Sequence, residues 1–269
     1  NELSYLILHV LGLLAYAEPH ASLRLHEGTP TWLLLKALET NQKVNGVPMY
    51  VNDKHISESI HRKGVSLEEA REFAVSGCSQ PVVPPRGHFN PLQINTAAIL
   101  DLALHNGISP MTGRRIGIET GEPRTFQTFD EVLDAFKRQH DFVVRRFLRL
   151  QRLMHLAEAQ RFRMPLRSAL DYASISNGKS HLIGGSDSYP LWYMKDRALV
   201  DVADSLIAVK KLVFDEKKLT MGELLETLDS DFTGQRGEEI RRMCLAAPKY
   251  GNDDDEADHM LRDVAKFSA

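Results

Sequence analysis

The residue with the most reactive side chain is Cys78, in the stretch Ala74–Pro81. Gly77 precedes it and permits backbone angles that other residues avoid, and a proline-rich segment, residues 82–85, follows. A thiol displayed in this way can be a nucleophile, a metal ligand, a radical carrier or a small buried apolar group. The residues around Cys78 must decide among these roles.

Three polar residues follow Cys78 in the same loop: Arg86, His88 and Asn90. Arginine can clamp a carboxylate through two hydrogen bonds, and histidine can exchange a proton near neutral pH. A cysteine protease could use His88 as its base, but it also needs a glycine-rich anion-stabilising element, and none is evident. The three residues are candidates for substrate contact, although any surface loop contains polar residues.

The other motifs favour structural roles. Cys244 stands between Met243 and Leu245 in a helical pattern, which predicts a core residue. Gly184-Gly185 precedes Ser186, Asp187 and Ser188 and could cradle an anion, but the P-loop spacing is absent and a structural turn is favoured.

The sequence offers no pattern typical of a metal site. It contains no CxxC pair and no cluster of histidines with a carboxylate at ligand spacing. The acidic run 253–256 lacks the spacing of a calcium-binding EF-hand loop, and acidic residues are favoured at the start of any helix.

Composition indicates a soluble globular chain. The 269 residues, 43% of them hydrophobic, can form one large domain or two modest ones. The net charge of −3 argues against nucleic acid as a partner, and the basic residues of 145–163 alternate with Leu and Met as on a solvated helix face. The most apolar stretch, Leu6–Ala17, is too short to span a bilayer. Two cysteines suggest a reduced, cytoplasmic setting.

Periodicity and capping signals predict a helix-rich α/β chain with short, buried, mostly parallel strands. Capping boxes begin at Ser66, Thr128 and Thr220, and the first of them predicts a helix that runs into the Cys78 stretch. A strand is expected to end at Leu182-Ile183, before the two glycines. The predicted strands are 22–25 and 48–51, and 109–125 is predicted to be a long ordered loop. Helices are predicted at 3–14, 30–42, 53–60, 94–104, 129–164, 199–214, 238–245 and 253–267, and two further helices are predicted to begin at the capping boxes of Ser66 and Thr220.

Several short motifs occur in the order typical of one family. They are Asn1–Tyr5, Pro48 with Asn52-Asp53, Glu69–Arg71 leading to Gly77-Cys78, Leu102–Gly107, Gly178-Lys179, Gly184-Gly185, Asp204–Leu206, Lys210–Val213 and Lys249–Asp253. On these motifs the chain resembles the glycyl radical enzymes, the pyruvate formate-lyase-like (PFL) group, over essentially its whole length. The adjacent double-cysteine pattern of pyruvate formate-lyase itself is absent, because Gly77 precedes Cys78.

The resemblance implies a fold and a chemistry. Residues 1–269 would be a helix-rich part of a ten-stranded α/β barrel, with the catalytic Cys78 on an internal finger loop. We expect the N-terminal part of the barrel and the C-terminal glycine radical domain to be absent, since the chain begins at Asn1 inside a helical pattern and ends at Ala269 without an Arg-Val-x-Gly-Tyr motif. The thiyl radical of Cys78 would abstract hydrogen from a small organic substrate.

The same resemblance implies cofactors and partners. No cofactor would be bound by this chain. A glycine outside it would carry the radical, which a radical S-adenosylmethionine activating enzyme would install under anaerobic conditions. We expect a cytoplasmic homodimer with a small-molecule substrate, no nucleic acid, no membrane and no metal.

Two departures bear on the reaction. Dehydrating and many decarboxylating members of the family resemble one another in having Glu two residues after the cysteine, where this chain has Gln80. The same subgroup tends to have an acid before the Gly-Lys motif, where this chain has Asn177. Neither amide can take up a proton at neutral pH. The departures favour C–C bond formation or cleavage, by fumarate addition or decarboxylation, over diol dehydration, with Gln80 among the substrate-binding residues.

A different class of function stays open. A catalytically inactive homologue or fragment would act as a structural or partner-binding subunit, and by itself the chain is expected to have no turnover. A downstream Arg-Val-x-Gly-Tyr motif would favour the enzyme.

Overall fold

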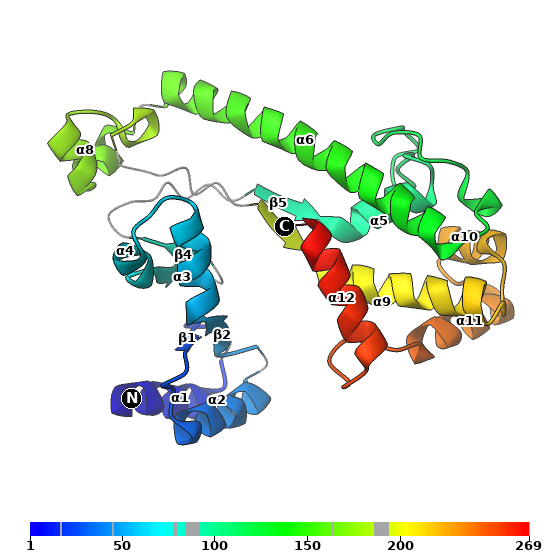
Figure 1. The fold of residues 1–269 in the computed structure, drawn as a ribbon, viewed down its shortest axis with the longest axis horizontal. Coiled ribbons are helices and arrows are strands. Elements are labelled where there is room, and N and C mark those ends of the chain that lie inside the picture. The colour runs from blue at the N-terminus through cyan, green and yellow to red at the C-terminus, as the bar shows by residue number, and fades with distance from the viewer. Residues whose placement is uncertain are drawn as a thin grey trace. The chain divides into compact units, whose positions relative to one another are not determined.

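The computed structural model describes residues 1–16, 18–44, 46–77, 80–83, 92–162, 164–185 and 194–268. The chain divides into two compact units (Figure 1). The first consists of Asn1–Asn90 and His155–Trp192, and the second of Pro91–Met154 and Tyr193–Ala269.

The first unit opens with two helices and a pair of parallel strands. Strand β1, Ser22–Leu25, pairs with β2, Met49–Asn52, and helix α2, Thr31–Lys43, connects them. Helix α1, Glu2–Leu14, packs on α2, where Leu8, Leu33 and Ala37 form a small core. The predicted strands 22–25 and 48–51 and both helices are therefore confirmed to within about a residue or two at their ends.

Helix α1 is less buried than its apolar sequence suggests. Only Leu8 and Leu11 are buried, whereas Leu3 and Leu13 are 69% and 71% exposed. One stripe of the helix packs on α2, and the other large apolar side chains of the helix are 41–71% exposed.

The next part of the first unit leads to the cysteine segment. Helix α3, Asp53–Arg62, is capped by Asn52, whose side chain accepts a hydrogen bond from His55 N (2.9 Å). Helix α4, Leu67–Arg71, is capped by Ser66, which accepts from Glu69 N (3.2 Å). The Ser66 cap was predicted from the sequence, and both caps satisfy amides that the first turn of a helix leaves without a partner.

The prediction that the Ser66 helix continues into the Cys78 stretch is wrong. Helix α4 ends at Arg71, and an antiparallel hairpin of β3, Ala74–Ser76, and β4, Gln80–Val82, follows. The carbonyl groups of Arg71 and Phe73 accept hydrogen bonds from the side chain of Arg24. In a continuing helix those carbonyls would instead bond the amides four residues later.

The segment 155–192 of the first unit contains short helices. They are α7, Pro165–Ala169, α8, Tyr172–Asn177, and the 3-10 turn η2, His181–Ile183. The predicted strand end at Leu182-Ile183 is therefore wrong. Leu182 is buried, but it lies in the 3-10 turn and not in a strand. Ser180 caps the start of this turn, because its side chain accepts a hydrogen bond from Leu182 N (3.4 Å).

The second unit is built on a second pair of parallel strands. Strand β5, Leu92–Asn95, pairs with β6, Met194–Arg197, and each strand leads into a helix. Helix α5, Thr96–Leu104, follows β5, and α9, Leu199–Val209, follows β6 and continues as a π-helical turn, η3, Lys210–Asp215. The predicted helix 94–104 thus begins later than expected, because Ile94 and Asn95 belong to the strand and Asn95 caps the helix.

Four further helices surround α9 and α5 (Figure 1). They are α6, Phe129–Arg161, α10, Met221–Asp229, α11, Gly234–Ala246, and α12, Asp255–Ser268. Helix α6 belongs to this unit as far as Met154. Its predicted stop at Pro165 is too late, since the helix ends at Arg161 and Pro165 begins α7.

The core of the second unit centres on α9. Val202, Leu206 and Ile207 are 0% exposed, and each such side chain contributes ~1.5–3 kcal/mol relative to an exposed one. The long loop 109–125 is held to the unit by Gln139 of α6, a fully buried amide. Its side chain accepts from Ile118 N (3.1 Å) and donates to Ile118 O (2.6 Å), so the loop is ordered, as predicted.

Candidate active site

The hairpin of β3 and β4 frames the candidate catalytic cysteine. Ser76 and Gln80 pair across the two strands, so the connection between them, which includes Cys78, is three residues long. Cys78 itself lies outside the described residues, as do Arg86, His88 and Asn90. Gly77 has a φ of +57°, in the left-handed region that glycine adopts without strain, so its place before the cysteine has a local conformational reason.

The base of this hairpin is anchored in the interior. Phe73 and Val83, which flank the paired residues Ala74 and Val82, are each 1% exposed. An isolated two-stranded hairpin has marginal stability in water, and burial of these two side chains contributes to the stability of this one.

Gln80 is the one candidate site residue that the structure describes. It begins β4, directly after the connection that includes Cys78, and it is 6% exposed. A Cβ atom added to Gly77 would lie 3.8 Å from Gln80 Oε1, which places the amide group beside the start of the connection. The amide can donate and accept hydrogen bonds, but it carries no titratable proton.

Arg24 is a residue near the hairpin that sequence reasoning missed. Its Nη1 donates to Phe73 O (2.7 Å) and its Nη2 to Arg71 O (2.8 Å), while its Nε donates to Asp53 Oδ1 (2.5 Å). No sequence signal marks this contact, because two of the three acceptors are backbone carbonyls more than forty residues along the chain.

Beside these residues lies a polar cavity of about 400 Å³. It is lined by His26, Glu27, Gly28, Asp53, Lys54, Ser57, Glu58, Leu67 and Arg71. Charges of both signs face it, and Lys54 Nζ lies 3.5 Å from Glu27 Oε1. Ser57 Oγ is buried without a hydrogen-bond partner within the described residues.

The second departure from the family pattern, Asn177, closes a compact turn. Its side-chain amide donates to Gly185 O (2.9 Å), and Gly185 N donates to Ser180 O (2.9 Å). A Cβ on Gly185 would lie 2.2 Å from Lys179 O, so only glycine fits there. Gly185 therefore has a structural role, as the favoured interpretation of this motif predicted, whereas residues 186–188 lie outside the described residues.

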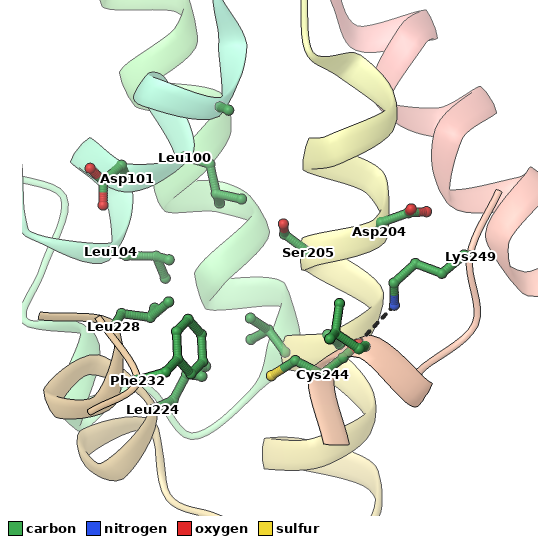
Figure 2. Close-up of a pocket in the computed structure, with 14 residues that line it drawn as sticks. Leu100, Asp101, Leu104, Asp204, Ser205, Leu224, Leu228, Phe232, Cys244 and Lys249 are labelled. Carbon is green, nitrogen blue, oxygen red and sulfur yellow. Dashed lines mark hydrogen bonds between the residues drawn. The ribbon is translucent and has the colours of Figure 1, made fainter. Parts of the chain in front are cut away.

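A second cavity, of about 320 Å³, lies within the second unit (Figure 2). Leu100 and Leu104 of α5, together with Leu224, Leu228 and Phe232, form an apolar wall on the side opposite Cys244. Residues from α9 and α11, Ala97 and Asp101 of α5, and Lys249 complete the lining, and none of the predicted site residues lies among them.

Cys244 is a packing residue in this cavity. Its side chain packs against the core of the second unit, as predicted. Burial raises the pKa of its thiol, and only the nearby Lys249 ammonium opposes that effect. Lys249 Nζ donates to Cys244 O (2.8 Å) and to Ala247 O (2.8 Å), which caps the end of α11. A thiol kept protonated in this way is a poor nucleophile.

A histidine between two carboxylates lies near the same cavity. His105 Nε2 is 2.9 Å from Asp229 Oδ1, and His105 Nδ1 is 2.7 Å from Asp101 O. Burial opposes the charged ring, but the Asp101 carbonyl and the Asp229 carboxylate outweigh it and raise the pKa of His105. The contact ties the end of α5 to the end of α10, and it indicates a structural role.

Among the residues that the structure describes, no group of three or more His, Cys, Asp or Glu side chains is arranged to hold a metal ion. The same part of the chain contains no helix that is both long enough and apolar enough to cross a membrane.

Comparison with known proteins identifies the family. The family model described as pyruvate formate lyase-like matches residues 1–269. The chain belongs to the pyruvate formate lyase-like family, the glycyl radical enzymes. Isethionate sulfite-lyase of Desulfovibrio desulfuricans is 35% identical over all of this chain, which covers 32% of that protein. The chain thus spans about a third of the length of the curated relatives it matches.

Solved structures of glycyl radical enzymes share the fold. Hydroxyproline dehydratase of Clostridioides difficile, solved with trans-4-hydroxy-L-proline bound, superposes with a TM-score of 0.82 at 32% identity. The B12-independent glycerol dehydratase of Clostridium butyricum, solved with glycerol bound, gives 0.80 at 32% identity. This chain is covered to 99% and 100% in these comparisons, and it covers 34% of each of the two proteins. The predicted fold class, a helix-rich part of the glycyl radical enzyme barrel, is confirmed.

Proposed function

We propose that this chain is the central catalytic segment of a glycyl radical enzyme, in which a thiyl radical on Cys78 abstracts hydrogen from a small organic substrate. The observation that carries the proposal is the family match over the whole chain, together with the position of Cys78 in a three-residue connection between the paired residues Ser76 and Gln80.

The hairpin suits a radical carrier better than a polar nucleophile. Its base is buried through Phe73 and Val83, and Gln80 beside the connection is uncharged and buried. An uncharged amide does not lower the pKa of a neighbouring thiol as a cation would. Hydrogen-atom transfer needs no thiolate, so it does not depend on such a cation.

The proposed hydrogen-atom transfers need no outside oxidant. Cys78 would give its thiol hydrogen atom to the family's glycyl radical, which is expected on a glycine outside this chain. The Cys78 thiyl radical then takes a hydrogen atom from a substrate C–H bond and becomes a thiol again. After the substrate radical has reacted, that thiol returns a hydrogen atom to the product radical.

Gln80 narrows the reaction class. An amide at this position cannot remove a proton from a substrate hydroxyl, so chemistry without a base there, such as decarboxylation or addition to fumarate, is favoured over diol dehydration. Arg86, His88 and Asn90 are the proposed substrate contacts on the chain that follows. A second candidate is elimination that uses a base elsewhere, and the relatives named as a sulfite-lyase and as dehydratases favour it.

The whole protein would work with partners. A radical S-adenosylmethionine activating enzyme would install the glycyl radical under anaerobic conditions, and two copies of the protein would form a homodimer in the cytoplasm. Residues 1–269 would be the partial barrel domain of that protein.

The test is substitution of the two cysteines in the full-length protein. After anaerobic activation we expect an electron paramagnetic resonance doublet from the glycyl radical in the wild type, in Cys78→Ser and in Cys244→Ser. Turnover should be lost only in Cys78→Ser, because Cys244 packs in the core of the second unit. Undiminished turnover in Cys78→Ser would refute the thiyl role.

The same measurement distinguishes an active enzyme from a catalytically inactive homologue. A full-length protein that has no Arg-Val-x-Gly-Tyr motif and gives no doublet after activation would act as a structural or partner-binding subunit.

A further inference from the structure

Every nitrogen of the Arg24 guanidinium group has a partner, and two of them bind backbone carbonyls of the segment that leads into the hairpin of Cys78. Nη1 donates to Phe73 O (2.7 Å), Nη2 to Arg71 O (2.8 Å), and Nε to Asp53 Oδ1 (2.5 Å). Nη2 also forms an ion pair with the same Asp53 oxygen. The guanidinium carbon lies 4.0 Å from the centre of the Phe73 ring, over its face.

These contacts join three elements of the first unit. Arg24 is the third residue of β1, where it pairs with Val51 of β2. Asp53 is the first residue of α3, and Arg71 is the last residue of α4. A single side chain therefore holds the parallel strand pair, the start of one helix and the end of another in fixed relation.

The contacts also fix the point where β3 begins. The carbonyl of Arg71 is one of those that the end of a helix leaves without a partner, and a cation is favoured there by the helix dipole. Phe73 is bound both through its carbonyl and through its ring, and β3 begins at the next residue. Cys78 follows Phe73 by five residues.

Arginine suits this task and lysine does not. The guanidinium group is planar and presents five N–H donors in fixed directions, so it can bind two carbonyls and a carboxylate while it stacks on a ring. A lysine ammonium is a single point charge, and it could stay near Asp53 without reaching both carbonyls.

We infer that Arg24 is a positioning residue, which sets the place of the Cys78 hairpin by holding its first strand to β1 and α3. The inference rests on the proposed function of Cys78. Hydrogen-atom transfer requires close approach of sulfur to the substrate C–H bond, and a misplacement of about 1 Å can reduce a rate by about 10²-fold.

The test compares Arg24→Met, Arg24→Lys and the control Lys43→Met in the full-length protein. Lys43 provides a matched loss of one cation, because it pairs with Glu39 (2.7 Å) on the exposed side of α2 in the same unit. Four quantities are measured: kcat, KM, the amplitude of the glycyl radical signal, and the rate at which iodoacetamide labels Cys78 in the protein before activation.

For Arg24→Met we expect kcat to fall by about 10²-fold, with KM and radical amplitude unchanged and faster labelling of Cys78. Arg24→Lys should lie between Arg24→Met and the wild type, and Lys43→Met should match the wild type. Arg24→Lys retains a cation beside Asp53, so this variant tests the positioning role of Arg24 if Arg24→Met does not fold. The inference is overturned by wild-type kcat in Arg24→Lys, by unchanged labelling, or by a loss that appears only in KM or in radical amplitude.

Failure of the proposed function has a different signature. If Cys78→Ser turns over like the wild type, the thiyl assignment fails whatever the Arg24 variants do. If Cys78→Ser is inactive and the Arg24 variants are fully active, only the positioning role fails.

Discussion

At the scale of single residues, Gln80 says most about the reaction. It is buried at the start of β4, beside the connection that carries Cys78. A glutamate placed there would lose solvation, which raises the pKa of a carboxyl group and weakens it as an anion, although a raised pKa can also suit a general base. Whether a carboxylate at position 80 helps the reaction therefore distinguishes the two reaction classes.

We predict that Gln80→Glu does not increase kcat/KM of the activated full-length protein, because the favoured chemistry uses no base at this position. The measurement is turnover of the native substrate by the wild type, by Gln80→Glu and by the control Gln80→Met, which fills a similar volume without a polar group. General base catalysis contributes ~10²–10⁴-fold, so a rise of that size in Gln80→Glu would place this protein with the dehydratases.

Single residues were predictable from sequence where the contact is local. The cap residues Ser66 and Thr220 bond amides three residues away, and both were identified from the spacing of a capping box. Arg24 was missed because two of its three partners are backbone carbonyl groups, which carry no side-chain signature, at positions distant in sequence. Asn177 was noticed for the acid it replaces, and its bond to Gly185 explains what the amide does here.

At the scale of elements, helix α10 shows how a capping box identified in the sequence stabilises a helix of the core. Thr220 Oγ1 accepts from Glu223 N (3.1 Å), and Glu223 Oε2 accepts from Thr220 N (3.3 Å), so both halves of the capping box form. Leu224 and Leu225 of the same helix are buried in the core of the second unit. The cap therefore supports a helix that contributes directly to the core.

We predict that Thr220→Ala lowers the free energy of unfolding of the second unit by ~1 kcal/mol, since one amide of the first turn loses its acceptor. Thr233→Ala is the matched control, because Thr233 is the N-cap of α11 but its side chain makes no capping hydrogen bond. Thermal unfolding of both variants checks the difference. Equal losses in the two variants would mean that the Thr220 hydroxyl contributes nothing specific.

Elements were predicted well where periodicity and caps agree, and poorly where a distant contact intervenes. Most helices and the first strand pair follow from the sequence. The hairpin β3–β4 does not, because a helical pattern leads into it from Ser66 and the Arg24 contact beside it comes from a distant part of the chain. The last two residues of strand β5 were predicted to be helical, because an apolar residue such as Ile94 fits a buried helix or a buried strand equally well. The strand partner of Ile94, Asp196, lies about a hundred residues further along the chain.

At the scale of the whole molecule, the barrel could not be derived from local patterns. Periodicity gave a helix-rich α/β chain, but the described strands occur as three separate pairs, two of them parallel. What gave the barrel was the order of short motifs along the chain, and the TM-score of 0.82 with hydroxyproline dehydratase confirms that class of fold. The catalytic cysteine came from the same motifs, and its role stays a prediction.

The two units differ in how much apolar surface each buries, and we predict that their backbone stability differs accordingly. In the second unit α9 contributes Val202 and Leu206, both 0% exposed, to a core shared with five other helices. In the first unit α1 buries only Leu8 and Leu11, and Leu13 is 71% exposed. Local opening is governed by such buried contacts, so amides of α9 should exchange with deuterium ~10²-fold more slowly than those of α1.

Hydrogen exchange of the 269-residue chain, followed by mass spectrometry, measures both helices at once. Helix α2 is the internal control, because it packs on α1 but buries Leu33 and Ala37. Exchange in α1 as slow as in α9 would show that the exposed stripe of α1 is covered in solution, by a second copy of the chain or by another part of it.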